Sequence, residues 1–115
     1  MTQVEILRNQ NGHIVEYEVS GHADFDDYGR DILCAAISVL SQTTILALEK
    51  VCKISQNDIK FCVNENTGYL KVTLSDNLTE DQRASANIVL ETMIVGMEDL
   101  AFQYPKHIKL MEKEE

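Results

Sequence analysis

The sequence has no tryptophan, only one proline and five glycines, and it is short of basic residues. Lys and Arg total 10 against 19 Asp and Glu, which gives a formal net charge of −9. Because nucleic-acid phosphates are bound by clustered Lys and Arg, this shortage argues against direct binding of nucleic acid. An acidic surface instead favours encounters with a basic partner, although charge alone does not identify that partner.

The sequence also lacks the features of a secretory leader or a membrane span. Residues 1–10 show no basic region followed by a long apolar one. The longest apolar-rich segment, 32–48, is interrupted by serine, threonine and glutamine, which predicts that it is too polar to cross a bilayer. We therefore expect a cytoplasmic protein, in which Cys34, Cys52 and Cys62 are reduced thiols rather than a disulfide framework.

With 115 residues the chain is expected to form a single domain, 1–115, with a substantial core. Asn11-Gly12 is a strong signal for a two-residue hairpin turn, Thr79 with Gln82 matches a helix capping box, and Pro105 ends a helix. The expected elements, in chain order, are strands at 3–8 and 13–20, a helix at 32–52, strands at 58–63 and 69–74, a helix from 79 to about 104, and a strand at 107–111.

This ββαββαβ order predicts an α+β domain with a mainly antiparallel sheet and two helices packed against it. The helix at 32–52 is apolar on nearly every side, so we expect it to be largely buried, between the sheet and a second layer. The expected buried side of the second helix consists of Ile88, Leu90, Met93, Ile94, Met97, Leu100 and Ala101.

The stretch GHADFDDYGRDILCAAIS, residues 21–38, joins a polar loop to the first helix. Asp31 stands at a helix N-cap position, which places Cys34 in the first turn. The unbonded N–H groups and the positive dipole end of that turn favour a thiolate, the nucleophilic form of cysteine. If the loop folds back, His22 reaches the sulfur, and the first-turn N–H groups are candidates for stabilising an oxyanion.

Structural explanations compete with this site. Most helical cysteines fill a core, and Asp31 is more simply a cap than a catalytic group. Asp24, Asp26 and Asp27 are more simply a solvated loop than a divalent-metal site with His22, since no known ligand spacing supports one. The remaining cysteines and histidines are expected to be structural or exposed and inert: Cys52, Cys62, His13 and His107.

The motif nevertheless resembles the ribosomal-processing cysteine protease family, Prp. The resemblance rests on Gly21-His22-Ala23, Tyr28-Gly29, and the run from Asp31 to Ser38, and it extends over nearly the whole chain. It implies a small cytoplasmic homodimer without a cofactor or metal, which removes an apolar and aromatic N-terminal extension from a basic large-subunit ribosomal protein. His22 would be the catalytic histidine and Cys34 the nucleophile.

Seven further residues are expected to bind substrate or support this site: Gly21, Ala23, Phe25, Tyr28, Gly29, Asp31 and Ser38. Ser38, one helical turn beyond Cys34, is expected to bond the helix backbone more readily than the site. The loop at 23–30 is expected to act as a flap over the peptide. The alternative from another functional class is a non-enzymatic acidic module that binds a basic ribosomal protein, with Cys34 as a core residue.

Overall fold

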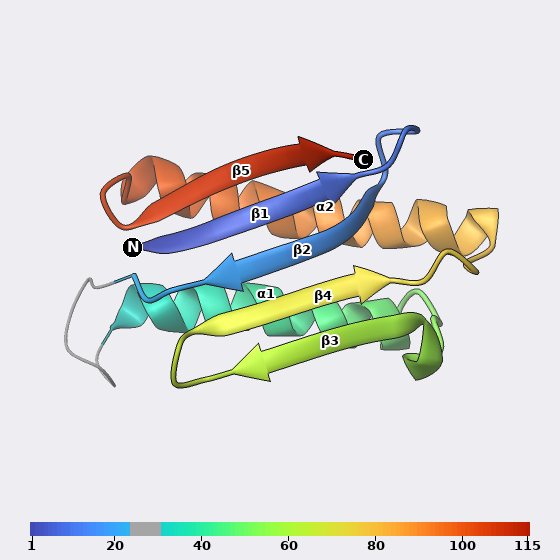
Figure 1. The fold of residues 1–115 in the computed structure, drawn as a ribbon, viewed down its shortest axis with the longest axis horizontal. Helices are drawn as coiled ribbons and strands as arrows, with labels where there is room; N and C mark the ends of the chain where they lie inside the picture. The colour runs from blue at the N-terminus through green and yellow to red at the C-terminus, as the bar shows by residue number, and fades with distance from the viewer. Residues whose placement is uncertain (24–30) are drawn as a thin grey trace.

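The computed structural model describes residues 1–23 and 31–115 and confirms the predicted order of elements (Figure 1). The elements are β1 Thr2–Arg8, β2 Ile14–Ser20, α1 Ile32–Lys50, a short 3-10 helix Gln56–Asp58, β3 Ile59–Asn64, β4 Tyr69–Leu74, α2 Glu80–Gln103 and β5 Ile108–Glu114. Both helices begin at the predicted caps, Asp31 and Thr79, and Gln82 completes the capping box of α2.

The five strands form one sheet in the order β3-β4-β2-β1-β5. Every neighbouring pair is antiparallel except β1 and β5, which run parallel with Thr2 opposite Ile108. The mainly antiparallel α+β fold is therefore confirmed. β3 and β5 are the two edges of the sheet, and each offers one unpaired side of its backbone.

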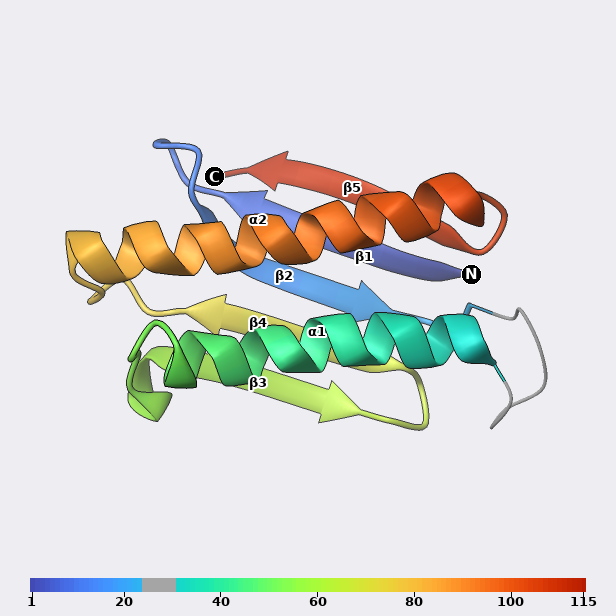
Figure 2. The ribbon, with the colours of Figure 1, turned by 180° about the vertical axis from the view of Figure 1, so that it is seen from behind.

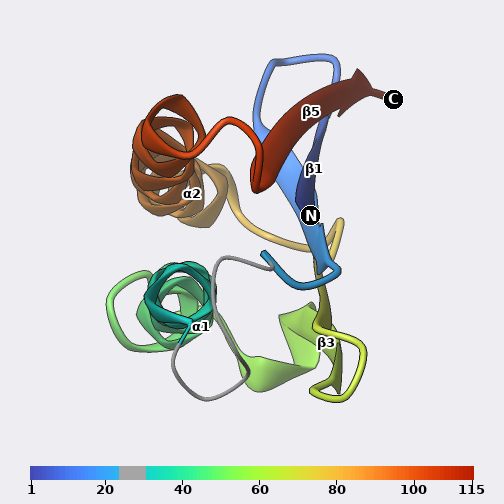
Figure 3. The ribbon, with the colours of Figure 1, turned by 90° about the vertical axis from the view of Figure 1, so that its left-hand side faces the viewer.

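Both helices lie on the same face of the sheet, side by side and antiparallel (Figures 2 and 3). Strand side chains alternate between this covered face and an open face. Val15, Tyr17 and Val19 are buried, whereas Glu16 and Glu18 are only partly covered. The open face is polar, and its contacts are cross-strand pairs such as Lys71 with Glu16 at 3.7 Å. The core is thus the single layer between sheet and helices.

The prediction that α1 is largely buried between the sheet and a second layer is wrong. Its covered side is narrow and includes Leu33, Ile37 and Leu48, which are buried against the sheet. Apolar side chains on the outer side are exposed instead, and Ile88, which was expected on the buried side of α2, is 70% exposed. The sheet therefore covers only some of the apolar side chains of α1. The others stay exposed because no second layer lies over the described part of the helices.

By length and composition α1 could also cross a membrane, contrary to the prediction that it is too polar. In the structure, however, it packs on the sheet, and a core helix of a globular domain passes the same test. Tyr17 illustrates this packing, since its hydroxyl donates to the carbonyl of Ser41 in α1 at 2.8 Å. Burial raises the pKa of the Tyr17 phenol above its usual value.

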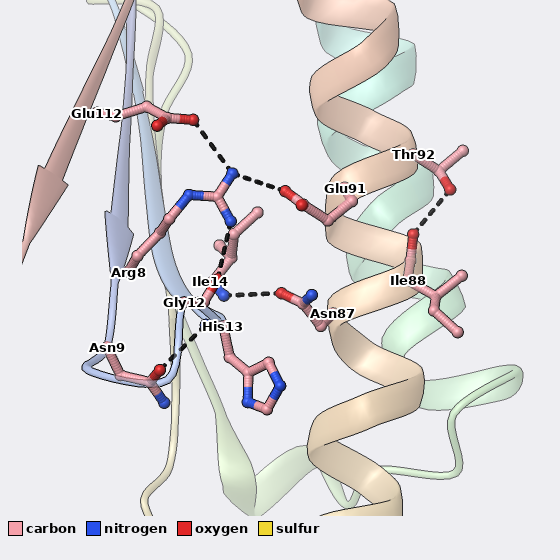
Figure 4. A network of polar contacts seen from close by, with 10 residues as sticks. All are labelled: Arg8, Asn9, Gly12, His13, Ile14, Asn87, Ile88, Glu91, Thr92 and Glu112. Carbon is pink, nitrogen blue, oxygen red and sulfur yellow. Dashed lines mark hydrogen bonds and ion pairs between the residues drawn. The ribbon is translucent and has the colours of Figure 1, made fainter.

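Side-chain contacts tie the β1–β2 hairpin to α2 and β5 at one end of the sheet (Figure 4). The Arg8 guanidinium donates to Glu91 at 2.7 Å and to Glu112 at 3.1 Å. These hydrogen bonds, that to Glu91 foremost, raise the pKa of Arg8. The Ile14 N–H donates to the side-chain oxygen of Asn87 at 2.8 Å. We call this group the Arg8 network.

Candidate active site

The predicted site residues converge at the opposite end of the sheet from the Arg8 network. The end of β2, the start of α1, the β3–β4 turn and the start of β5 all lie there, beside the N-terminus (Figure 1). Residues far apart in the chain meet because the hairpins and the parallel β1–β5 pair return the chain to this end. We call it the site end.

Cys34 occupies the third helical position of α1, as predicted from its distance to Asp31. The Asp31 carboxylate accepts from the N–H groups of Leu33 at 3.0 Å and of Cys34 at 2.9 Å. The Ala35 N–H donates to the Asp31 carbonyl at 3.1 Å. These three amides are therefore engaged by the cap, and the prediction that such first-turn amides serve an oxyanion is wrong for them.

The Cys34 sulfur accepts a hydrogen bond from a backbone amide that the sequence did not indicate. The N–H of Ala23 donates to Cys34 Sγ at 3.3 Å, and Ala23 is fully buried. Ala23, just beyond the end of β2, thus contacts the first turn of α1. An N–H aimed at sulfur stabilises a thiolate more than a thiol, because hydrogen bonds to an ionised acceptor are the stronger ones. The backbone therefore supplies an electropositive contact to the nucleophile candidate.

The imidazole of His22 is oriented by the β3–β4 turn. Its Nε2 lies 3.2 Å from the carbonyl oxygen of Asn66. A carbonyl only accepts hydrogen bonds, so in this contact Nε2 carries the proton. The contact thus fixes the orientation of the ring and the proton on Nε2.

Two glycines allow this turn to approach the His22 segment. Gly21 and Gly68 adopt positive φ angles of 85° and 64°. A Cβ added to Gly68 would lie 2.4 Å from the carbonyl oxygen of Gly21 and 3.1 Å from the His22 ring. A Cβ on Gly21 would lie 2.5 Å from the carbonyl oxygen of Met1. Both positions need glycine because backbone meets backbone there.

His107, which was expected to be exposed and inert, belongs to the same end of the molecule. It is half-buried, and its Nδ1–H donates to the carbonyl of Ala23 at 2.8 Å. Its own carbonyl accepts from the N–H of Thr2 at 2.9 Å. The prediction that His107 is exposed is therefore wrong.

A groove of about 880 Å³ runs from His22 and Cys34 along α1. One wall is the side of α1 that presents Ser38, Gln42 and Ile45, and the other is the β3–β4 hairpin. Phe61 and Val63 point from β3 toward this side and stay more than half exposed, because α1 does not extend over the edge strand. An edge strand, an apolar wall and a thiol thus share one depression.

The remaining predicted residues have mixed outcomes. Ser38 lines the groove, and its carbonyl accepts from the hydroxyl of Ser41 at 3.3 Å. Cys52 is buried, but Cys62 is exposed on β3 and is not a core residue. Three predicted site residues and the aspartates of the hypothetical metal site lie outside the described residues: Phe25, Tyr28 and Gly29, and Asp24, Asp26 and Asp27.

Within residues 1–23 and 31–115, no three metal-ligating side chains come together. The site residues that the sequence analysis missed come from the second hairpin and from the start of β5: Phe61, Val63, Asn66, Gly68 and His107. A glycine in the turn at 64–68 was the only local signal for any of them. The others depend on strand order, which the sequence did not reveal.

Comparison with known proteins identifies the family of this chain. A family model described as cysteine protease Prp matches residues 1–109. The ribosomal processing cysteine protease Prp of Bacillus subtilis is 26% identical over 110 residues, covering 96% of each chain. The protein of that name from Staphylococcus aureus is 27% identical over 113 residues, covering 98% of this chain and 100% of the relative.

Solved structures of similar chains share the fold. A Streptococcus mutans protein, SMU.848, superposes with a TM-score of 0.84 at 28% identity, covering 100% of this chain and 96% of its own. The S. aureus protease Prp, in complex with a covalently linked product peptide, superposes with a TM-score of 0.81 at 26% identity, covering 98% of this chain and 100% of its own.

The family model spans nearly the whole chain, and its members are peptide-bond hydrolases that use cysteine. The alternative of a binding module without enzymatic activity is therefore rejected. The chain belongs to the Prp family of cysteine proteases.

Proposed function

We propose that this protease removes the N-terminal extension of a bacterial large-subunit ribosomal protein, with Cys34 as nucleophile and His22 as general base. The observation that carries the proposal is the position of Cys34, in the first turn of α1, with the Ala23 N–H on its sulfur and a groove leading away from it. The relatives named ribosomal processing proteases supply the substrate class.

The proposed reaction has two steps. His22 accepts the thiol proton, and the Cys34 thiolate attacks the scissile carbonyl carbon to form a C–S bond. The C–N bond then breaks, the amine leaves with the proton from the imidazolium, and a thioester remains. In the second step water attacks the thioester while His22 takes its proton, and the thiolate leaves with the electron pair of the C–S bond.

The groove suits an extended apolar peptide. From Cys34 to Ile45 the helix rises about 16 Å, the length of about five extended residues. Phe61 and Val63 offer an apolar surface for the apolar and aromatic segment that the family resemblance implies. The covalently linked product peptide of the S. aureus relative supports a peptide bound next to the cysteine. The acidic surface favours encounter with a basic ribosomal protein.

The test uses a synthetic peptide that contains the extension and the first residues of the host ribosomal protein. We expect Cys34→Ala to abolish cleavage and His22→Ala to reduce it at least 100-fold, with unchanged circular dichroism. Cys62→Ala is the matched control, because this thiol is exposed and outside the site. Full cleavage by Cys34→Ala would disprove the assignment.

We also propose that the homodimer implied by the resemblance forms through the helices. Three exposed apolar residues repeat every seven positions on each helix: Ile32, Val39 and Leu46 on α1, and Ile88, Val95 and Phe102 on α2. We call these six residues the helix face; they are 52% to 86% exposed. A shallow depression of about 360 Å³ between Val39 and Ile88 joins the two stripes.

A second copy is the partner that best fits the helix face. Seven-residue apolar spacing is typical of helix-to-helix packing, and a two-fold axis brings the same patch of two copies together. Sedimentation velocity tests this: the unmodified protein should be a dimer, and Val39→Glu with Val95→Glu should be monomeric. Gln3→Glu adds one negative charge on the open face of the sheet, and this control should remain dimeric, whereas Val39→Glu alone should already weaken the dimer. A monomeric unmodified protein would contradict the proposal.

We also propose that the protein is cytoplasmic, as the family resemblance implies. Blotting of cell fractions from the host would test this directly. Recovery in the membrane or periplasmic fraction would contradict it.

A further inference from the structure

The backbone of Ala23 has contacts on both of its polar groups. Its N–H donates to Cys34 Sγ at 3.3 Å, and its carbonyl accepts from His107 Nδ1–H at 2.8 Å. Ala23 lies beyond the end of β2, whose pairing with β1 ends at Ser20. The sheet therefore does not hold this amide in place, and its aim at the sulfur depends on other contacts.

His107 is well placed to hold the Ala23 amide in position. The backbone N–H of His107 donates to Tyr104 at 2.9 Å, and its carbonyl accepts from Thr2 at 2.9 Å. The next residue, Ile108, is buried and begins β5. The imidazole therefore extends from a backbone fixed on both sides, and a short hydrogen bond transfers that rigidity to Ala23.

We infer that His107 is a positioning residue for the nucleophile: it holds the Ala23 carbonyl so that the Ala23 N–H stays on Cys34 Sγ. This inference rests on the proposed role of Cys34. His107 does not line the groove among the described residues, so it acts through Ala23 and not on the substrate. Both the neutral Nδ1–H tautomer and the imidazolium donate to a carbonyl, so the contact persists when the ring is protonated.

The chemical consequence concerns the thiolate. Loss of the His107 donor leaves the Ala23 segment free to shift, and the sulfur loses an N–H that stabilises its charged form. The thiolate then forms only at higher pH. The attack on the scissile carbonyl slows, whereas the binding of the peptide in the groove is unaffected.

The experiment compares His107→Phe, which keeps a ring but removes the donor, with His107→Asn, whose side-chain N–H can occupy the position of Nδ1. Alkylation of Cys34 by iodoacetamide is followed by mass spectrometry across pH, with the exposed Cys62 as internal reference. His107→Phe should shift the Cys34 profile to higher pH and slow its alkylation about ten-fold below neutral pH. His107→Asn should restore it.

Peptide cleavage gives the second readout. His107→Phe should lower kcat about ten-fold at unchanged KM. His13→Phe, the same change at the opposite end of the molecule, should alter neither readout. An unchanged alkylation profile in a folded His107→Phe protein would overturn the inference, even if Cys34→Ala abolishes cleavage. A shifted profile together with full cleavage by Cys34→Ala would show that His107 holds the amide on the sulfur but that Cys34 is not the nucleophile, so a failure of the proposed function is distinguishable from a failure of the His107 contact.

Should His107→Phe not fold, as judged by circular dichroism, His107→Ala and His107→Asn are compared instead. The same pH profile of Cys34 alkylation in both variants would overturn the inference. A profile shifted to higher pH in His107→Ala but not in His107→Asn would support it.

Discussion

The two ends of the sheet are held together by different chemistry. At the far end, the Arg8 network uses long charged side chains and one amide side chain to join β1, β5 and α2. At the site end, the contacts are largely made by backbone groups: the amide of Ala23 on sulfur, the carbonyl of Asn66 on His22, and two glycines in backbone contact. One end is fixed by charge, the other by close backbone approach.

This difference explains how a site can be both rigid and reactive. Long side chains carry much rotamer freedom, and exposed ion pairs contribute little to stability. Backbone groups are fixed by the fold itself, so they can aim a donor at a sulfur or select a tautomer at small entropic cost. An added side-chain atom is therefore expected to clash at the two glycines of the site end, whereas the far end has room for one.

The largest expected difference between the two ends is in their glycines. Gly68 and Gly12 both have positive φ, but a Cβ on Gly12 would meet nothing within 4 Å. Gly68→Ala should lower the free energy of unfolding by about 3 kcal/mol, from strain and from overlap with Gly21. Gly12→Ala should cost about 1 kcal/mol, from strain alone. Chemical denaturation measures both.

Activity sharpens this prediction. In conditions where both variants are folded, Gly68→Ala should cleave peptide at least ten-fold more slowly, because the turn that orients His22 is displaced. Gly12→Ala should cleave normally. Equal behaviour of the two variants would contradict the close approach of Gly68 to the His22 segment.

A second prediction concerns Tyr17, which joins the middle of the sheet to α1. Tyr17→Phe should cost about 1 kcal/mol at neutral pH, since the carbonyl of Ser41 loses its donor. Burial raises the pKa of Tyr17, so the folded state favours the neutral phenol. Its stabilising contribution is complete below the ordinary tyrosine pKa of 10.0 and falls as pH rises above it, by about 1.4 kcal/mol per pH unit.

Denaturation at increasing alkaline pH tests this sign. The unmodified protein should lose stability more steeply than Tyr17→Phe, because the unfolded phenol ionises first. Parallel curves for the two proteins would show that Tyr17 is not buried as described. The other tyrosines are common to both and cancel in the comparison.

The third prediction uses the two helix caps, one at each end. Asp31→Ala and Thr79→Ala should each lower the stability by about 1 kcal/mol. Only Asp31→Ala should also slow peptide cleavage, because it frays the turn that carries Cys34. A cleavage loss in Thr79→Ala of the same size would mean that global stability, and not local order, limits the reaction.

The smallest effect is expected for Arg8→Ala. Its partners Glu91 and Glu112 are about half exposed, so the loss should be about 0.5 to 1 kcal/mol and should shrink in high salt. Arg8→Ala should cleave the peptide as fast as the unmodified protein does, in low salt and in high salt. A large activity loss would show that the far end is coupled to the site, and would break the contrast between the two ends.

Most of the fold could be predicted because its signals are local. The Asn11-Gly12 turn, the cap at Asp31 and the capping box at Thr79 each specify an element from a few residues. The hairpin and both caps are confirmed. The turn is longer than the predicted two residues, because the Gly12 N–H donates to the Asn9 carbonyl and the Asn9 N–H to the His13 carbonyl. The exposure of Ile88 was missed because an apolar pattern does not show which side of a helix the chain itself covers.

The site was predictable in part for the same reason. Cys34 follows from its distance to the cap, and the GHA motif indicated His22. The contacts of Asn66, Gly68 and His107 were not predictable, since they depend on which strands are neighbours. The engagement of the Leu33 and Cys34 amides by Asp31 follows from its predicted N-cap position, so the cap prediction itself conflicted with an oxyanion role for these amides.

The parallel pairing of β1 with β5 joins the first strand of the chain to the last. During synthesis, β1 has no partner on that side until the ribosome has made residue 108, and His107 reaches Ala23 only then. Pairings between such distant segments are the slow steps of folding. A nascent chain therefore carries Cys34 long before it carries a complete catalytic site, and proteolytic activity should appear only when the C-terminal strand has joined the sheet.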